Sequence, residues 1–203
     1  MVSADPKISF DNSYTRLPSS FFSLIKPEKM PDIKLVRLNI DLAKELEFDL
    51  NWLKSQSGIL FLGGQNVISG STPIAQAYAG HQFGGFSPQL GDGRAVLLGE
   101  VKLKNGLRTD IQLKGSGKTP FSRSGDGRSG LGPVMREYLI SEAMSAFDIP
   151  TTRALAALST GESILRDGFV PGAILVRTAS SHVRVGTFQY FAARGMQSEI
   201  KIL

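Results

Sequence analysis

Residues 94–115 read RAVLLGEVKLKNGLRTDIQLKG, and this stretch decides the fold. Two runs rich in β-forming residues flank Lys-Asn-Gly at 104–106, a combination typical of a hairpin turn. Alternation along the second run places Ile111 and Leu113 on the side that faces the core. The opposite side carries three polar residues, Asp110, Gln112 and Lys114. The stretch therefore predicts an antiparallel hairpin whose second strand points Lys114 away from the core.

The strongest helical pattern follows this hairpin. Residues 133–147 read PVMREYLISEAMSAF, with Pro133 at the start, apolar residues at helical spacing and Glu137 in the first turns. RALAALST (153–160) and GAILVRTA (172–179) have the composition of further strands. An antiparallel sheet with one key helix belongs to the α+β class.

The residues upstream predict smaller elements. LVRLNI (35–40) is typical of a strand, and DLAKELEF (41–48) of a short helix capped by Asp41. A further short helix is expected near residues 21–25. Residues 1–34, with scattered proline and little periodicity, are expected to form an irregular arm that packs on a lobe comprising residues 35–203.

Two more expectations concern the centre of the chain. Thr72 and Pro73 resemble a cap and first turn for a small helix in IAQAYAG (74–80). The following segment, residues 80–93, contains too much glycine for a regular element.

Composition limits the chemistry that the chain can perform. It has 203 residues, of which 41% are hydrophobic and 20% charged, as in ordinary soluble proteins. No apolar run approaches the roughly 18 residues of a membrane helix, and no secretory signal is visible, so we expect a soluble, intracellular protein. Without cysteine and with only two histidines, thiolate zinc sites, disulfides and histidine-rich metal sites are excluded within these residues.

The net charge of +5 is unevenly distributed. Residues 1–100 contain nine Lys and Arg against ten Asp and Glu, whereas residues 101–203 contain fourteen against eight. This asymmetry suits an anionic partner such as a nucleotide or nucleic acid, but a solvated basic surface gives the same count.

Residues 114–130, KGSGKTPFSRSGDGRSG, contain the ending of a Walker A loop. The pattern requires glycine five residues before the Gly-Lys-Thr ending, where this chain has Gln112. It also requires a helix that begins at the lysine, whereas Pro120 and Gly125 would break one. The segment therefore fails as a Walker A loop.

The order of the elements is more informative than any single motif. A glycine turn at 91–94, the outward Lys114 and the helical Glu137 follow one another as in the nucleotide-binding lobe of protein kinases. Each feature alone is more often structural: a turn, a solvated lysine, a helix surface residue. Downstream, Arg177 and Arg184 could reach one anionic group, or could be two surface arginines.

Several long segments together carry a resemblance to the selenoprotein O family, known in bacteria as the YdiU proteins. They are FDNSYTRLP, AYAGHQFGGFSPQLGDGRAVLLGE, DIQLKGSGKTPFSRSGDGRSGLGPVMREYLISEAM and ILVRTASSHVRVGTFQYFAARG. The match runs from about residue 10 to about residue 195 and keeps their order. It implies a protein-kinase-like fold, of which this chain is the N-terminal part, ending before the catalytic loop.

The resemblance also implies an activity, the transfer of AMP from ATP to Ser, Thr or Tyr hydroxyls of proteins. Carried over residue by residue, the nucleotide contacts are Gly91, Gly93, Arg94, Lys114, Asp126, Gly127, Arg177 and Arg184. Glu137 matches the helix glutamate that orients Lys114. The family's catalytic base and magnesium ligands correspond to positions beyond Leu203, so we expect no catalytic or metal-binding residue here and no activity from this chain alone.

The expected partners are ATP and proteins that present hydroxyl side chains, with no membrane partner. The resemblance implies a cytoplasmic location in a bacterium and a mitochondrial one in a eukaryote. An ordinary protein kinase and a non-catalytic ATP-binding scaffold remain alternatives. A nucleic-acid-binding domain is less favoured, because aromatic residues make up only 8% and do not alternate with the arginines as in a stacking surface.

Overall fold

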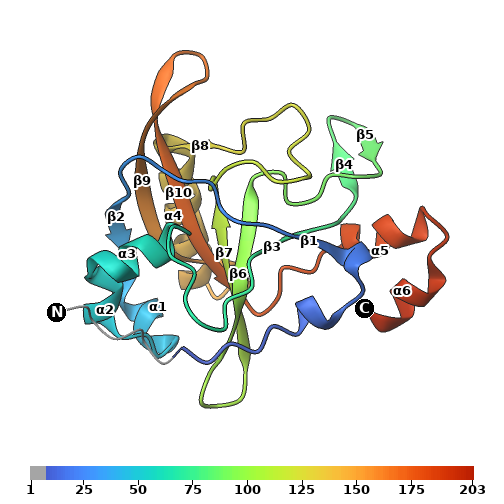
Figure 1. Ribbon diagram of the computed structural model, residues 1–203, viewed down its shortest axis with the longest axis horizontal. Coiled ribbons are helices and arrows are strands. Elements are labelled where there is room, and N and C mark those ends of the chain that lie inside the picture. Colours follow the sequence, from blue (N-terminus) through green and yellow to red (C-terminus); the bar gives the residue numbers. More distant parts are fainter. Residues whose placement is uncertain (1–7) are drawn as a thin grey trace.

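The computed structural model describes residues 8–203, and the first seven residues of the expected arm lie outside the described part. The fold is an α+β arrangement around one antiparallel sheet, as predicted (Figure 1). The strands follow the order β1 (Phe22–Leu24), β3 (Ile74–Gln76), β6 (Ala95–Lys102), β7 (Arg108–Lys114), β10 (Phe169–Ala179), β9 (Arg153–Leu165) and β2 (Lys34–Leu38). A short strand, β8 (Ser129–Gly130), also pairs with β10.

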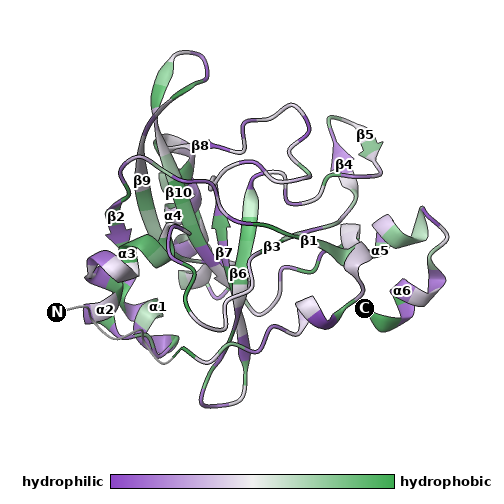
Figure 2. Ribbon diagram, viewed as in Figure 1, coloured by the Kyte–Doolittle hydropathy of each residue, from purple (hydrophilic) through white to green (hydrophobic). Residues whose placement is uncertain are grey.

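Helices cover both faces of this sheet. One face packs against α1 (Ile40–Glu45), α2 (Leu50–Lys54) and α3 (Gln56–Leu62), and the other against α4 (Leu131–Ala146). The last helices, α5 (Val185–Ala192) and α6 (Gln197–Ile202), lie beyond β1 and β3 (Figure 1). Hydrophobic residues concentrate in the central strands and in the helical segments that pack on them (Figure 2).

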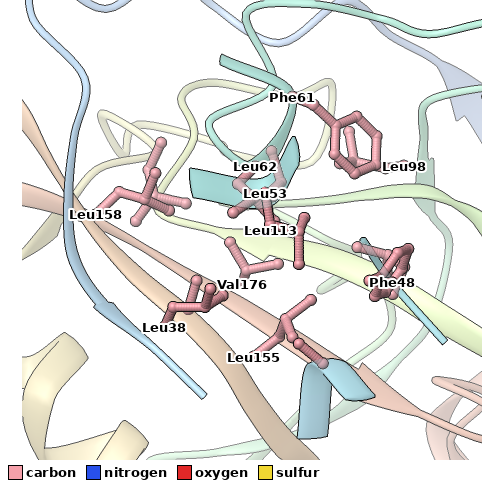
Figure 3. Packing of buried hydrophobic residues seen from close by; sticks show 14 of the residues in the cluster. Leu38, Phe48, Leu53, Phe61, Leu62, Leu98, Leu113, Leu155, Leu158 and Val176 are labelled. Carbon is pink, nitrogen blue, oxygen red and sulfur yellow. The ribbon is translucent and has the colours of Figure 1, made fainter. Parts of the chain in front are cut away.

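The largest hydrophobic cluster lies between the sheet and helices α1 to α3 (Figure 3). Leu113 and Val176 from adjacent strands meet Leu53 and Leu62 from the helices there. A second, smaller cluster lies under α4, where Val134 packs against β9 and β10. Because α4 packs mainly on β9 and β10, much of the same face of β6 and β7 is left for other contacts.

The predicted hairpin at 94–115 is confirmed. Strands β6 and β7 pair antiparallel, with Ala95 opposite Lys114 and Lys102 opposite Arg108. Gly106 in the connecting turn has φ of 85°, a conformation that glycine adopts without steric cost. Ile111 and Leu113 lie in the main core, as alternation predicts.

The predicted helix at 74–80 is wrong. Residues 74–76 form β3, which pairs with β1 on one side and with β6 on the other. Ile74, Ala75 and Gln76 are all almost fully buried. A segment enclosed on both sides satisfies its backbone polar groups in the sheet, and this tertiary context outweighs the local cap signal of Thr72 and Pro73.

Three other upstream expectations need correction. Residues 19–21 form a 3₁₀ turn and β1 follows, in place of a helix near 21–25. The cap of α1 is Asn39, whose side chain accepts from the Leu42 amide at 3.2 Å, and Asp41 lies in the first turn. The glycine-rich segment forms a small hairpin of β4 (Gly80–Gln82) and β5 (Gly85–Ser87).

Downstream, α4 begins at Leu131, two residues before the predicted start. The division into an arm (1–34) and a lobe (35–203) stays a prediction, and β1 from the arm pairs within the main sheet. Among residues 8–203, no helix has the length and apolar character needed to span a bilayer.

Candidate functional site

A pocket of about 620 Å³ opens beside α4, where the ends of β7 and β10 meet the loops at 90–95 and 121–128. The β4–β5 hairpin forms another part of its wall. All the sequence-predicted contact residues line it: Gly91, Gly93, Arg94, Lys114, Asp126, Gly127, Arg177 and Arg184. The fold thus brings together residues separated by more than ninety positions in the chain.

The pocket is strongly cationic. Its lining contains two aspartates against seven lysine and arginine residues, which are Arg94, Lys114, Arg123, Arg128, Arg166, Arg177 and Arg184. Some of these charges are already paired: Arg128 binds Glu28 and Glu162 at 2.6 and 2.8 Å. Within the described residues, Arg94 and Arg184 form no ion pair, so their charge is available to a ligand.

Glu137 lies behind the pocket and joins two of its partly buried cations, Lys114 and Arg177. Lys114 Nζ donates to Glu137 Oε2 at 2.5 Å, and Arg177 Nη1 donates to Glu137 Oε1 at 3.2 Å. Burial lowers the pKa of Lys114, while the Glu137 hydrogen bond opposes that shift. Burial likewise lowers the pKa of Arg177, which stays protonated because guanidinium is so basic. One carboxylate therefore holds two cations side by side.

Two buried residues extend this arrangement: Gln112, to which the sequence assigned no role, and Asp92, which lies within the predicted glycine turn at 91–94. Gln112 accepts from Arg177 Nε at 2.8 Å and from Nη2 at 2.5 Å, and donates through Nε2 to Asp92 Oδ2 at 3.3 Å. Asp92 Oδ2 also accepts from the backbone N–H of Gln76 at 3.0 Å. Burial raises the pKa of the Asp92 carboxyl, since removal from water disfavours the charge. The available signal was the alternation that puts Gln112 on the same face as Lys114.

Two glycines of the pocket allow close approach of neighbouring groups, Gly127 to the backbone of Gly117 and Gly91 to the side chain of Phe121. Gly127 has φ of 69°, and a Cβ there would lie 2.0 Å from the carbonyl oxygen of Gly117. Gly91 has φ of 60°, and a Cβ would lie 2.3 Å from Phe121. No larger residue fits at either position without moving the pocket wall.

Asp126 and Arg184 differ in their partners: Asp126 forms an ion pair, whereas Arg184 lies over an aromatic ring. The Asp126 carboxylate binds the Arg166 guanidinium through two contacts of 2.8 and 3.1 Å, and this contact lowers the pKa of Asp126. Arg184 lies at the N-terminus of α5 with its guanidinium 4.7 Å from the ring centroid of Tyr78. Burial raises the pKa of Tyr78 to about 12, so its hydroxyl is neutral at physiological pH.

The Gly-Lys-Thr triplet at 117–119 does not form a Walker A loop. Lys118 is exposed, and Thr119 Oγ1 donates to the Asp92 carbonyl oxygen at 2.6 Å. The next helix begins only at Leu131. The triplet therefore supports the neighbouring loop and presents no helical amides to a phosphate.

The magnesium ion that the resemblance implies does not fit the described residues. Across residues 8–203, no three His, Asp or Glu side chains gather as metal ligands. Of the nearby carboxylates, Glu137 and Asp126 are already bound by basic side chains, and Asp92 is buried and accepts from Gln76 and Gln112.

Fold and pocket together define an α+β protein whose site suits a polyanion, because guanidinium and ammonium groups converge on it. A family model described as protein adenylyltransferase SelO matches residues 6–203. The chain therefore belongs to the SelO family, which confirms the resemblance seen in the sequence.

Curated relatives agree with this assignment. A protein nucleotidyltransferase YdiU from Rhodopseudomonas palustris strain BisB18 is 59% identical over 194 residues, covering 96% of this chain and 40% of that protein. The protein of the same name from Nitrobacter winogradskyi is 58% identical over 196 residues, covering 97% and 39%. One from Methylorubrum extorquens strain PA1 is 62% identical over 186 residues, covering 92% and 37%. The chain thus spans about 40% of the length of these relatives.

Proposed function

We propose that this chain supplies the ATP-phosphate-binding part of a protein adenylyltransferase, which transfers AMP from ATP to Ser, Thr or Tyr hydroxyls of other proteins. One observation carries the proposal: the residues expected to contact the nucleotide all line one cationic pocket, with Glu137 bridging Lys114 and Arg177. In this proposal residues 35–203 form a protein-kinase-like lobe on which residues 1–34 pack.

The pocket's own residues account for how a triphosphate would be held. Lys114 and Arg177 are fixed by Glu137 at the deep end, while Arg94 and Arg184 add charge without an acidic partner among the described residues. Terminal phosphates bound by these cations would leave the α-phosphorus nearer the mouth, toward an acceptor hydroxyl. Such positioning and charge stabilisation are the main sources of catalysis in phosphate-transfer reactions.

The remaining parts of the reaction are proposed to come from outside these residues. The curated relatives are more than twice as long as this chain, and the described residues contain no metal-ligand cluster. We therefore expect no transfer of AMP by this chain alone. Label transfer by the purified chain that disappears in Lys114→Ala would contradict this expectation.

An ATP titration by calorimetry tests the site. Wild type should show saturable binding, and Lys114→Ala and Arg177→Ala should each weaken it about tenfold or more, since a charge-assisted contact to phosphate is lost. Lys118→Ala is the matched control, because Lys118 belongs to the same glycine-rich segment but is exposed and outside the pocket lining. Equal affinity of Lys114→Ala and Lys118→Ala for ATP would overturn the assignment.

A second experiment separates AMP transfer from phosphate transfer. ATP labelled at the α or the γ phosphate is given to this chain and, in parallel, to a full-length curated relative. Retention of the α label on protein identifies adenylyl transfer, whereas retention of the γ label alone would identify a kinase and reject the proposal.

A further inference from the structure

A continuous chain of hydrogen-bonded side chains runs from the buried interior to Lys114 in the pocket. Its members, in order, are Asp92, Gln112, Arg177, Glu137 and Lys114. The pairing of the strands creates this chain, because Gln112 on β7 lies directly opposite Arg177 on β10. Side chains directly opposite on one face of an antiparallel pair are close enough to interact.

Gln112 is the centre of this chain and is completely buried. Arginine has only donors, and Asp92 Oδ2 already accepts from the Gln76 backbone N–H, so the Gln112 side chain must present its oxygen to Arg177 and its nitrogen to Asp92. Its oxygen accepts twice from Arg177, and its nitrogen donates to Asp92 Oδ2. A flipped amide would lose all of these bonds, and Asp92 therefore fixes the orientation of the amide.

The same contacts restrict the guanidinium of Arg177. Nε and one N–H of Nη2 are used by Gln112, and one N–H of Nη1 by Glu137. A guanidinium has five N–H donors, so two remain for a ligand. Arg177 lines the pocket, and its side chain is only 12% exposed, which leaves little freedom for another orientation.

We propose that Gln112 is a positioning residue for phosphate binding, which acts through Arg177 and is itself oriented by Asp92. This inference rests on the proposed function for the identity of the ligand. A buried polar network is costly unless every partner is satisfied, so a leucine or methionine would serve packing better at this central sheet position. The polar network instead holds one cation in a single orientation before the anion arrives, which reduces the cost of binding.

A double-mutant cycle tests the inference. Gln112→Met removes both hydrogen-bonding ends at similar volume and should weaken ATP binding about tenfold, through loss of the Arg177 orientation. In an Arg177→Met background the same change should have no further effect on ATP binding, because the guanidinium that Gln112 orients is absent. If Gln112→Met weakens ATP binding by the same factor in wild type and in Arg177→Met, Gln112 acts on the fold in general and the inference is overturned.

Thr178→Val is the matched control, since Thr178 is a buried polar residue next to Arg177 on the opposite face of β10. Its ATP affinity should equal that of wild type. If Thr178→Val weakens binding as much as Gln112→Met, the effect is not specific to Gln112 and the inference fails.

A second readout does not depend on ATP. In wild type the Arg177 Nε–H, assigned by its absence in Arg177→Met, should exchange slowly with water in nuclear magnetic resonance spectra. Gln112→Met should make that exchange fast. Continued protection of Nε–H in Gln112→Met would overturn the inference, even if wild type binds no ATP. If wild type binds no ATP but Gln112→Met still loses the protection of Arg177 Nε–H, only the proposed function is rejected.

Discussion

At the centre of β7 the two faces are almost equally buried but are held by different interactions. Ile111 and Leu113 on one face pack against hydrophobic side chains from α1 to α3 and the neighbouring strands. Asp110 and Gln112 on the other face are 4% and 0% exposed, and each is hydrogen-bonded to a side chain from a later segment. Burial alone therefore does not distinguish core from site here. The partners do, because buried polar groups persist only where they are paired.

The largest expected effect is on the apolar face. Leu113→Ala should lower the free energy of unfolding by about 2–5 kcal/mol, through lost burial and a residual cavity. Urea denaturation measures it. Leu107→Ala is the control, since Leu107 is 64% exposed in the hairpin turn and should change stability by less than about 0.5 kcal/mol. Similar losses in the two variants would mean that this face of β7 is not core.

On the polar face, removal of one partner should be almost as damaging. Asp110 Oδ2 accepts from the His182 amide at 2.8 Å and lies 2.9 Å from His182 Nδ1. Asp110→Ala leaves both nitrogen atoms buried without an acceptor and should cost about 1–3 kcal/mol. Urea denaturation again measures the change.

Asp41→Ala makes the same chemical change on the surface, where the carboxylate is 88% exposed and lies 3.7 Å from Lys44. Its cost should stay below about 1 kcal/mol. If Asp110→Ala lowers the free energy of unfolding no more than Asp41→Ala does, the buried hydrogen bonds do not hold the polar face of β7, and the contrast between the two faces is wrong.

Local patterns predicted the parts of the fold that carry their own signal. The hairpin turn at 104–106 and the helical spacing after Pro133 gave β6, β7 and most of α4. β3 was missed because nothing local distinguishes Ile74 to Gln76 from an alanine-rich helix start. Its strand conformation comes from enclosure between β1 and β6, which are distant in the chain.

The candidate site shows the same limit. The order of glycine turn, lysine and glutamate suggested Lys114 and Glu137, and their 2.5 Å contact is present. Gln112 was placed on the correct face, but its role was invisible until the pairing of β7 with β10 set Arg177 opposite it. Gln112 and Arg177 are 65 residues apart, so their contact depends on the register between their strands. A local sequence pattern does not determine that register.

The smallest expected effect concerns two pocket carboxyls whose pKa values shift in opposite directions. Burial raises the pKa of Asp92, so the folded chain holds that proton to a higher pH than the unfolded chain. Its contribution to the free energy of unfolding is therefore lost as pH rises from the ordinary to the raised value. Asp92→Asn removes this titration, and the stability of the variant relative to wild type should increase with pH.

Asp126 provides the opposite case, because its hydrogen bond to Arg166 lowers its pKa. The stability that it contributes is present above the ordinary pKa and is lost as pH falls toward the lowered value. Asp126→Asn should thus lose stability relative to wild type as pH rises. Urea unfolding of the three proteins between about pH 3 and about pH 8 measures both trends. Opposite slopes mean that burial sets the energetics of Asp92 and the Arg166 guanidinium those of Asp126, whereas parallel slopes mean that the net positive charge of the pocket dominates both.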